Sequence, residues 1–262
     1  MNTENLKLIV QKKYGEIAEG QKPCCGTDSC CSSVDYTVFN DDYSGQKGYN
    51  KDADLGLGCG LPTEFAQIKE GDHVLDLGSG AGNDCFVACT QTGNKGRVTG
   101  LDFTEAMIQK ANDNLKKTGF QNIAFVLGDI ENMPFADAAF DVVISNCVLN
   151  LVPDKQKAFS EIFRVLKHGG HFSISDVVIV GNLPQGLKQD AEMYAGCVSG
   201  AICKDEYIAI VKEQGFSRIK IQKEKEIVLS DKVLLNHITP DELDRFKQSG
   251  SGIFSITLYA EK

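Results

Sequence analysis

The fold is decided by residues 74–84, which read Val-Leu-Asp-Leu-Gly-Ser-Gly-Ala-Gly-Asn-Asp. The apolar run 74–77 predicts a strand, a glycine-rich turn follows it, and the next segment has helical spacing. Gly78, Gly80 and Gly82 allow positive φ and let a ligand approach the backbone where a Cβ would clash. The stretch therefore predicts a nucleotide-binding turn. The alternative is a glycine turn that only connects a strand to a helix.

The charge beside this turn indicates which nucleotide it holds. A pyrophosphate-binding loop has the spacing G-x-G-x-x-G and holds its anion at a helix N-terminus. Here the spacing is G-x-G-x-G, and Asp76 and Asp84 flank it. Two carboxylates repel a pyrophosphate but attract a ligand that carries an ammonium and a sulfonium. The pattern favours S-adenosylmethionine.

Two further acids follow predicted strands at the same edge. Residues 97–101 predict the second strand, and Asp102 after it stands where this fold places a carboxylate for ribose hydroxyls. Asp129 follows the third predicted strand, residues 122–127, and is a candidate acceptor for an adenine amino group. A plain turn aspartate is the alternative interpretation of Asp129.

The charge balance argues against some classes of partner. With 27 basic and 36 acidic residues, the net charge of -9 argues against nucleic acid and against anionic membrane surfaces. We find neither a membrane-spanning apolar run nor a signal peptide, so we expect a cytoplasmic protein. The ten cysteines are then mostly reduced thiols, available to a soft metal or metalloid.

The rest of the chain predicts an α/β fold: a doubly wound, mostly parallel Rossmann-like sheet, with an N-terminal arm and a small C-terminal cap. We place the helix and cysteine-bearing arm at 1–50, the cofactor-binding domain at 51–224 and the cap at 225–262. Further strands are expected at 139–147, 171–180 and 218–222, helices at 5–19, 62–68, 104–118, 155–167 and 205–214, and alternating cap strands through 253–258.

Several cysteines have more than one interpretation. Cys24, Cys25, Cys30 and Cys31 could ligate zinc, but the adjacent pairs suit a mobile thiol-bearing arm better. Cys85 and Cys89, four apart on a predicted helix, are favoured as small buried hydrophobes. The position of Cys203 is uncertain.

Three other cysteines are expected to meet above the cofactor turn. Cys147 ends the fourth strand, and Cys197 lies in a segment that follows the fifth strand. Cys59 stands between two glycines, which predicts an exposed loop that can withdraw. Topology sends all three to the carboxyl edge of the sheet, where ligands bind. Three thiolates suit a soft, thiophilic centre such as trivalent arsenic, with a buried cysteine without a role as the alternative for Cys147.

The sequence resembles the arsenite methyltransferases of the class I S-adenosylmethionine-dependent family. The resemblance is carried by Tyr36-Thr37-Val38-Phe39-Asn40, Gly58-Cys59-Gly60, Asp76 to Gly82, Ser145-Asn146-Cys147 with Asn150-Leu151, and Gly196-Cys197. It implies arsenic-binding, catalytic roles for Cys59, Cys147 and Cys197. It implies cofactor-binding roles for Asp76, Gly78, Ser79, Gly80, Gly82, Asp102, Met107, Asp129, Ile130 and Asn146.

The function that follows is methylation of arsenite, then of methylarsenite, by S-adenosylmethionine, as a detoxification. The partners are arsenite or its thiol conjugates and a cellular thiol reductant. One alternative is methylation of a small organic acceptor such as a quinone precursor, which leaves the three thiols unexplained. Another is an arsenical-binding protein without turnover; the acidic charge and the lack of a helix-turn-helix pattern argue against a DNA-binding sensor.

Overall fold

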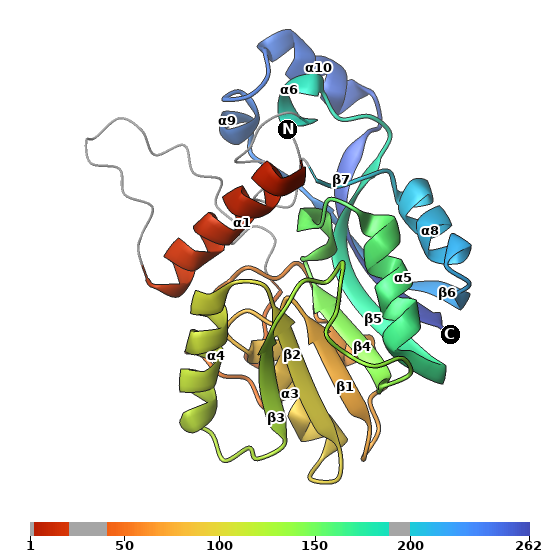
Figure 1. Ribbon diagram of the computed structural model, residues 1–262. Coiled ribbons are helices and arrows are strands. Elements are labelled where there is room, and N and C mark those ends of the chain that lie inside the picture. The colour runs from red at the N-terminus through yellow and green to blue at the C-terminus, as the bar shows by residue number, and fades with distance from the viewer. Residues whose placement is uncertain (1–2, 21–40, 189–199) are drawn as a thin grey trace.

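A computed structural model of the chain, which describes residues 3–20, 41–188 and 200–262, contains one seven-stranded sheet in the order β3-β2-β1-β4-β5-β7-β6 (Figure 1). The strands are β1 His73–Leu77, β2 Arg97–Asp102, β3 Ile123–Leu127, β4 Phe140–Asn146, β5 Leu166–Val180, β6 Ser217–Ile227 and β7 Gly252–Glu261. The helices are α1 Thr3–Ala18, α2 Pro62–Phe65, α3 Asn83–Thr92, α4 Glu105–Lys116, η2 Leu149–Leu151, α5 Lys155–Val165, α6 Gln185–Lys188, α8 Lys204–Glu213, α9 Asp231–Leu234 and α10 Pro240–Gln248.

The first five strands run parallel, as their apolar composition predicts for strands buried on both faces. β1 pairs with β2 on one side and with β4 on the other. The chain therefore reverses its direction of winding at β1 and β4, and their carboxyl ends border the crevice where ligands bind in this fold. The doubly wound prediction is confirmed.

Two apolar cores cover the two faces of the sheet. On one face, α5 and α8 pack on the central strands, with Phe159, Phe172 and Tyr207 fully buried. On the other face, α3 packs on β1, β2 and β4 through residues such as Phe86, Cys85 and Ala88. The rings of Phe86 and Phe120 stack with centroids 6.1 Å apart. Both faces of β1 and β4 are thus held rigid at the edge that forms the crevice.

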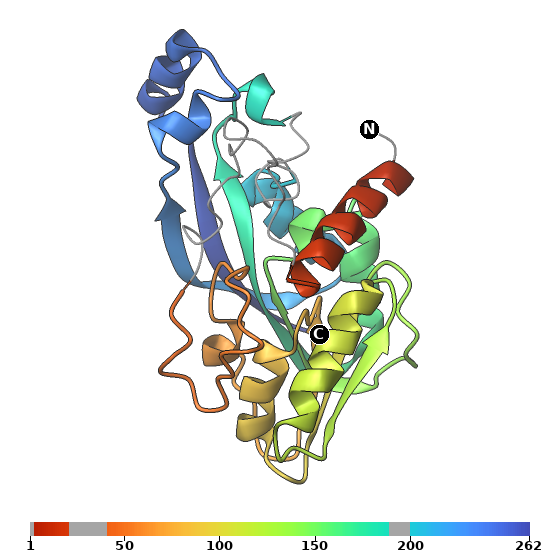
Figure 2. The same ribbon diagram turned by 90° about the vertical axis from the view of Figure 1, so that its left-hand side faces the viewer.

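The C-terminal strands correct one prediction. Residues 253–258, expected in a separate cap, belong to β7, which lies inside the main sheet and pairs antiparallel with both β5 and β6. The prediction was wrong because alternation shows that a strand is half-buried but not which strand it pairs with. The expected cap contains helices instead: Figures 1 and 2 show α6, α9 and α10 together beyond the ends of β5 and β7. Where the domain boundaries fall stays a prediction.

Smaller differences concern element lengths. α2 begins at Pro62 as expected but ends at Phe65 instead of 68, and β5 begins at Leu166 instead of 171. Among the described residues, no helix is both long and apolar enough to cross a membrane.

The N-terminal helix α1 lies above α4, at the carboxyl edge of the parallel strands, in both ribbon views (Figures 1 and 2). Gln11 donates a hydrogen bond to the Phe103 carbonyl at 3.2 Å, and Lys110 of α4 donates one to the Ala18 carbonyl at 3.0 Å. These contacts place α1 beside the crevice.

Candidate active site

The crevice holds a cavity that is partly open to solvent. Its wall includes most of the residues predicted for the cofactor, namely Gly78, Ser79, Gly80, Asp102, Met107, Asp129, Ile130 and Asn146, and also Cys147. A mostly apolar cavity with a few convergent polar groups is typical of a site for a small molecule or cofactor.

The glycine turn has the predicted backbone conformation. Gly78, Gly80 and Gly82 have φ of 65°, 50° and 98°. A Cβ at Gly80 would meet nothing within 4 Å, whereas a Cβ at Gly78 would lie 2.4 Å from Val148 Cγ2. At Gly78 the turn therefore lies close to the loop that follows β4, whereas at Gly80 it leaves open space. This is the close backbone approach that glycine permits.

Asp102 joins the end of β2 to this turn. Its two carboxylate oxygens accept hydrogen bonds from the Gly80 N–H at 3.0 Å and the Thr104 N–H at 2.8 Å. Burial raises the pKa of Asp102, and the backbone hydrogen bonds oppose that effect. Each oxygen keeps a second lone pair, so the predicted acceptance of ribose hydroxyls is compatible with the geometry.

The described residues fit S-adenosylmethionine. The cavity leaves open space at the Gly80 backbone, where a Cβ would meet nothing within 4 Å, so a ligand can lie directly against the turn. The carboxylates of Asp84 and Asp102 on the same wall supply the negative charge that a cationic ligand needs.

Asp76 and Gly82 are not on the cavity wall. Asp76 is 2% exposed, and one of its oxygens accepts a hydrogen bond from the Cys85 thiol at 3.2 Å. Loss of water, followed by repulsion from Asp84, raises the pKa of Asp76 well above its usual value. Gly82 is the N-cap of α3. The structure places both as supports of the turn, and their predicted direct contact with cofactor stays a prediction.

Asp84, in the first turn of α3, is the carboxylate that faces the cavity instead. Tyr43 donates a hydrogen bond from its hydroxyl to Asp84 at 2.8 Å, and Asn146 donates one at 3.3 Å. Burial raises the pKa of Asp84 to about 6, and these hydrogen bonds limit the rise. Near neutral pH it is mostly ionised and available to an ammonium group.

The adenine end of the predicted site is partly occupied by α1. Lys7 forms ion pairs with Asp129, at 2.6 Å, and with Glu131. The other oxygen of Asp129 accepts the Glu131 N–H at 2.9 Å. An adenine amino group would therefore share Asp129 with Lys7. Met107 and Ile130, both buried, supply apolar surface for a ring at this end.

Cys147 follows directly after β4 and has the left-handed backbone conformation, with φ of 60°. This conformation is uncommon for a residue with a Cβ and is often found at functional sites. The Cys147 N–H donates to the Ser175 carbonyl at 2.7 Å, which fixes the turn against β5. The residue lines the cavity and is 4% exposed. Its predicted place beside the cofactor turn is confirmed.

Cys59 differs from the prediction in one respect. It is 0% exposed and is not on the cavity wall, so the expectation of an exposed loop is wrong, and its ability to withdraw stays a prediction. The flanking glycines allow tight packing here: a Cβ at Gly58 would lie 2.7 Å from Asn146 Nδ2, and one at Gly60 would lie 2.5 Å from Ser175 Oγ. The Cys59 carbonyl also accepts a hydrogen bond from the Ser255 hydroxyl of β7. The loop is pressed onto β4, β5 and β7.

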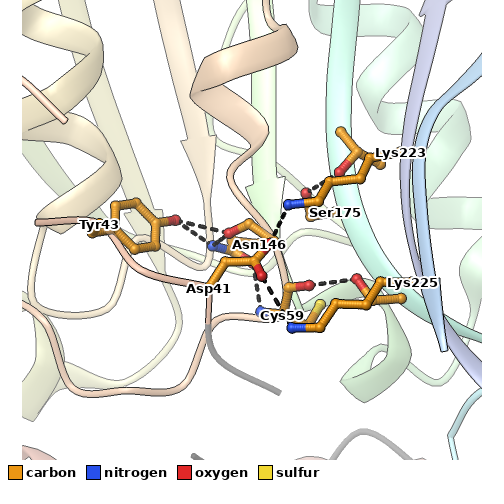
Figure 3. A network of polar contacts seen from close by, with 10 residues as sticks. Asp41, Tyr43, Cys59, Asn146, Ser175, Lys223 and Lys225 are labelled. Atoms are coloured by element: carbon orange, nitrogen blue, oxygen red, sulfur yellow. Dashed lines mark hydrogen bonds and ion pairs between the residues drawn. The ribbon is translucent and has the colours of Figure 1, made fainter. Parts of the chain in front are cut away.

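Asn146 connects the cofactor half of the cavity to Cys59 (Figure 3). Its Oδ1 accepts the Cys59 N–H at 3.0 Å. Its Nδ2 donates to the Tyr43 hydroxyl and to the Gly60 carbonyl at 2.9 Å. The Asn146 amide thus contacts the loop of Cys59 and also Tyr43, whose hydroxyl donates to Asp84. The predicted cofactor role of Asn146 is joined by a role in positioning Cys59.

The remaining cysteines divide into two groups. Cys197 and the doublets Cys24, Cys25, Cys30 and Cys31 lie outside the described residues, so their roles stay predictions. Cys85 and Cys89 are buried as predicted, and Cys203 is exposed as the N-cap residue of α8. Within the described ranges, no group of three or more His, Cys, Asp or Glu residues forms a metal site.

The wall also includes residues that are absent from the predicted set, among them Lys7, Val10 and Tyr14 of α1, and Tyr43. The α1 residues recur at positions i, i+3 and i+7, so the helical periodicity could have identified them as one face. It could not have shown that this face meets the cofactor crevice. Tyr43 carries no sequence signal of its own.

Comparison with known proteins agrees with this geometry. A family model described as a methyltransferase domain matches residues 68–215. A solved structure of an arsenic(III) S-adenosylmethionine methyltransferase from Chlamydomonas reinhardtii is similar, with a TM-score of 0.67, 35% identity, and coverage of 78% of this chain and 67% of that one. The chain belongs to the arsenite methyltransferase family of S-adenosylmethionine-dependent methyltransferases.

Other members of the family are longer than this chain. An arsenite methyltransferase of Halobacterium salinarum is 41% identical over 235 residues, which are 85% of this chain and 60% of the relative. The human arsenite methyltransferase is 37% identical over 186 residues, 68% of this chain and 49% of the relative. The chain thus spans 60% of the length of the first relative and about half the length of the second.

Proposed function

We propose that this protein methylates trivalent arsenic, taking arsenite and then methylarsenite as substrates and S-adenosylmethionine as the methyl donor. The observation that carries the proposal is the pair of buried cysteines, Cys59 and Cys147, which belong to one buried cluster. Cys147 lines the cavity together with the glycine turn, and the neighbour of Cys59, Gly58, lines it too. The activities named for the relatives agree with it.

The thiols bind the substrate. Soft thiolates prefer a thiophilic centre, and trivalent arsenic exchanges hydroxyl or small-thiol ligands for cysteine sulfur, with release of water or thiol. Cys59 and Cys147 are proposed as two of the ligands, and Cys197, outside the described residues, as the third. None of these exchanges requires a strong general base, because each leaving group carries away the proton of the thiol that replaces it.

The cofactor half orients the donor. S-adenosylmethionine supplies, when bound, a methyl group on a sulfonium, which the lone pair of thiolate-bound arsenic can attack. Asp102 is proposed to accept the ribose hydroxyls and Asp84 to attract the ammonium. Asn146 contacts both the Cys59 N–H and the Asp84 carboxylate, and so fixes the thiol loop relative to the carboxylate that attracts the cofactor. Such positioning can supply a large part of a rate acceleration.

The test is direct. Purified protein is mixed with S-adenosylmethionine, a small thiol and arsenite, and methylated arsenic is measured by chromatography with mass detection. We expect methylarsenic products that disappear when either arsenite or the cofactor is omitted. Binding of both ligands without product would favour an arsenical-binding protein, and methylation of a quinone precursor with no effect of arsenite would favour the organic-acceptor alternative.

The proposal includes conditions outside the site. Thiolate ligands must be reduced to bind arsenic, so the reaction needs a cellular thiol reductant and a reducing compartment, for which we propose the cytoplasm. The assay tests the first condition, since omission of the small thiol should stop turnover.

A further inference from the structure

A buried polar cluster lies on β5, next to the residue whose carbonyl accepts the Cys147 N–H, and the proposed function does not use it. Asp176 of β5 is 0% exposed, and Tyr207 of α8, also 0% exposed, donates a hydrogen bond to its carboxylate at 3.0 Å. The Val177 N–H donates to the other carboxylate oxygen at 3.0 Å. Lys155, at the start of α5, is 9% exposed.

The position of this cluster follows from the strand register. Asn146, the last residue of β4, pairs with Ser175, and the Cys147 N–H donates to the Ser175 carbonyl at 2.7 Å. Asp176 is the next residue of β5, so it lies level with Cys147 at the same edge of the sheet. Electrostatic repulsion from both Cys59 and Cys147 contributes to the raised pKa of Tyr207, after burial and the effect of Asp176. The backbone of Cys147 is thus hydrogen-bonded to the residue that directly precedes Asp176.

Burying such groups is expensive. Ionised side chains lose their hydration, and apolar replacements of similar volume are often neutral or stabilising. Burial raises the pKa of Asp176 to about 7, while Lys155 and the hydrogen bonds from Val177 and Tyr207 lower it. Near neutral pH a substantial fraction of the carboxyl is thus ionised inside the protein. Perturbed carboxyls beside a ligand site are candidates for a role in that site.

In the proposed reaction a negative charge at Asp176 can stabilise a positive charge that develops on arsenic. The lone pair of arsenic forms the As–C bond, the methyl C–S bond breaks, and its electron pair remains on sulfur. The positive charge carried by the sulfonium is thereby transferred to arsenic. A fixed carboxylate beside the thiols interacts weakly with neutral, thiolate-bound arsenic and more strongly with the cation that develops, which lowers the barrier.

We propose that the Asp176 carboxylate is the counter-ion for the positive charge that arsenic acquires during methyl transfer, and that Tyr207 and Lys155 hold that carboxylate in place. This inference rests on the proposed function and assigns Asp176 a role through its charge. The competing account is structural: the Tyr207–Asp176 hydrogen bond only anchors α8 to β5.

Matched variants separate the two accounts. Asp176→Asn removes the charge and keeps the shape, and Tyr207→Phe removes the anchoring hydrogen bond and keeps the carboxylate. Asp113→Asn, on the exposed face of α4, is the control for loss of one negative charge. Methyl transfer is measured in a single turnover with arsenite already bound, and arsenite affinity is measured separately.

We expect Asp176→Asn to slow methyl transfer by about 10- to 100-fold, since each tenfold corresponds to about 1.4 kcal/mol of barrier. Arsenite affinity should change by less than about threefold, as should the transfer rate of Asp113→Asn. Tyr207→Phe should slow transfer much less than Asp176→Asn does, because it keeps the carboxylate. A rate for Asp176→Asn equal to that of the parent would overturn the inference. So would equal losses in Asp176→Asn and Tyr207→Phe accompanied by loss of arsenite binding.

A second readout needs no turnover. Removal of a negative charge near a thiol lowers the pKa of that thiol, because the thiolate is then less repelled. The pH midpoint for alkylation of Cys147 should therefore fall in Asp176→Asn and stay constant in Asp113→Asn. An unchanged midpoint contradicts a field from Asp176 at the thiols, whatever the activity.

If Asp176→Asn does not fold, Lys155→Met decides the question, because it leaves Asp176 intact but removes the positive charge that favours its ionisation. We expect slower transfer at pH 7, by about threefold or more, and an unchanged rate would overturn the inference. The parent protein keeps the two proposals apart. A parent that does not methylate arsenite contradicts the proposed function, whereas a parent that does, alongside an equally fast Asp176→Asn, contradicts only this inference.

Discussion

The two halves of the cavity are built in different ways. The cofactor half comes from successive strand-to-helix turns, and the glycine turn, Asp84 and Asp102 all fall within residues 78–102. The thiol half combines the loop at Cys59, the end of β4 at Cys147 and the antiparallel pair of β5 with β7. One half is a local motif and the other an assembly of distant segments. Variants should therefore affect the two halves separately, except at the residue that joins them.

The largest effects are expected from the thiols. Arsenite offers three exchangeable positions, but methylarsenite offers only two, so one thiol becomes dispensable after the first methylation. We expect Cys147→Ser to lower methylation of both substrates about 100-fold or more, because a hydroxyl is a poor ligand for arsenic. Cys59 does not line the cavity, whereas Cys147 does, so Cys59 is the thiol we expect to be dispensable: Cys59→Ser should lose arsenite methylation to a similar extent and retain methylation of methylarsenite. Product formation from each substrate is the measurement.

Two controls accompany these variants. Cofactor affinity, which depends on the other half, reports on folding and should change by less than about twofold. Cys203→Ser, at an exposed residue, should behave as the parent. If Cys147→Ser still methylates methylarsenite near the parent rate, another thiol is the ligand, and an inactive Cys203→Ser would identify it.

Asn146 is the position where the two halves should respond together. Asn146→Ala removes the acceptor of the Cys59 N–H and a donor to Asp84. We expect both cofactor affinity and arsenite affinity to fall about tenfold, which is typical of one or two lost buried hydrogen bonds. Calorimetry with each ligand alone is the measurement. Tyr43→Phe is the matched comparison, since it removes the hydroxyl that donates to Asp84 and keeps the Asn146 acceptor of the Cys59 N–H. It should weaken cofactor binding by about threefold and weaken arsenite binding less than Asn146→Ala does. A loss confined to one ligand in Asn146→Ala would show that the halves are not coupled there.

Acidity should affect the cofactor half. The pKa of Asp84 is raised to about 6, and its ionised form is the one that attracts an ammonium. Cofactor affinity should therefore decrease as the pH falls from 7.5 through 6, by up to about tenfold per pH unit below the pKa. Asp84→Asn should bind more weakly at pH 7.5 and lose most of this dependence. The neighbouring acids Asp54 and Asp76 remain in that variant. If the slope persists unchanged, one of them is its source.

The smallest effect separates two acids within the cofactor half. Asp102→Asn should weaken cofactor binding about tenfold, because the carboxylate is buried and also holds the Gly80 and Thr104 N–H groups. Asp129→Asn should weaken it about threefold or less, because its side chain is 44% exposed and already paired with Lys7. Titration with the cofactor measures both. If both variants lose the same affinity, the Lys7–Asp129 ion pair breaks when the cofactor binds, and Asp129 accepts the adenine amino group in full.

The sequence predicted the local parts of the site well. Positive φ at the glycine turn and the carboxylate after β2 follow from short stretches whose neighbours in space are also neighbours in sequence. The position of Cys147 was predicted because a strand end fixes its residue against the adjacent strand. These features depend on backbone sterics and strand topology, which a single sequence carries.

The burial of Cys59, the pairing of β7, the contribution of α1 and the buried Asp176 were not predictable in this way. Each depends on which distant segments meet: Gly60 against Ser175, β7 against β5, Lys7 against Asp129. By itself the sequence determined the cofactor turn, the order of the parallel strands and the thiols available to the substrate. Only the tertiary structure decided that Asn146 joins the two halves. It also decided that Asp176 is buried next to the residue that accepts the Cys147 N–H. These contacts form between chain segments that local propensity leaves independent of one another, and the packing of the complete sheet brings them together.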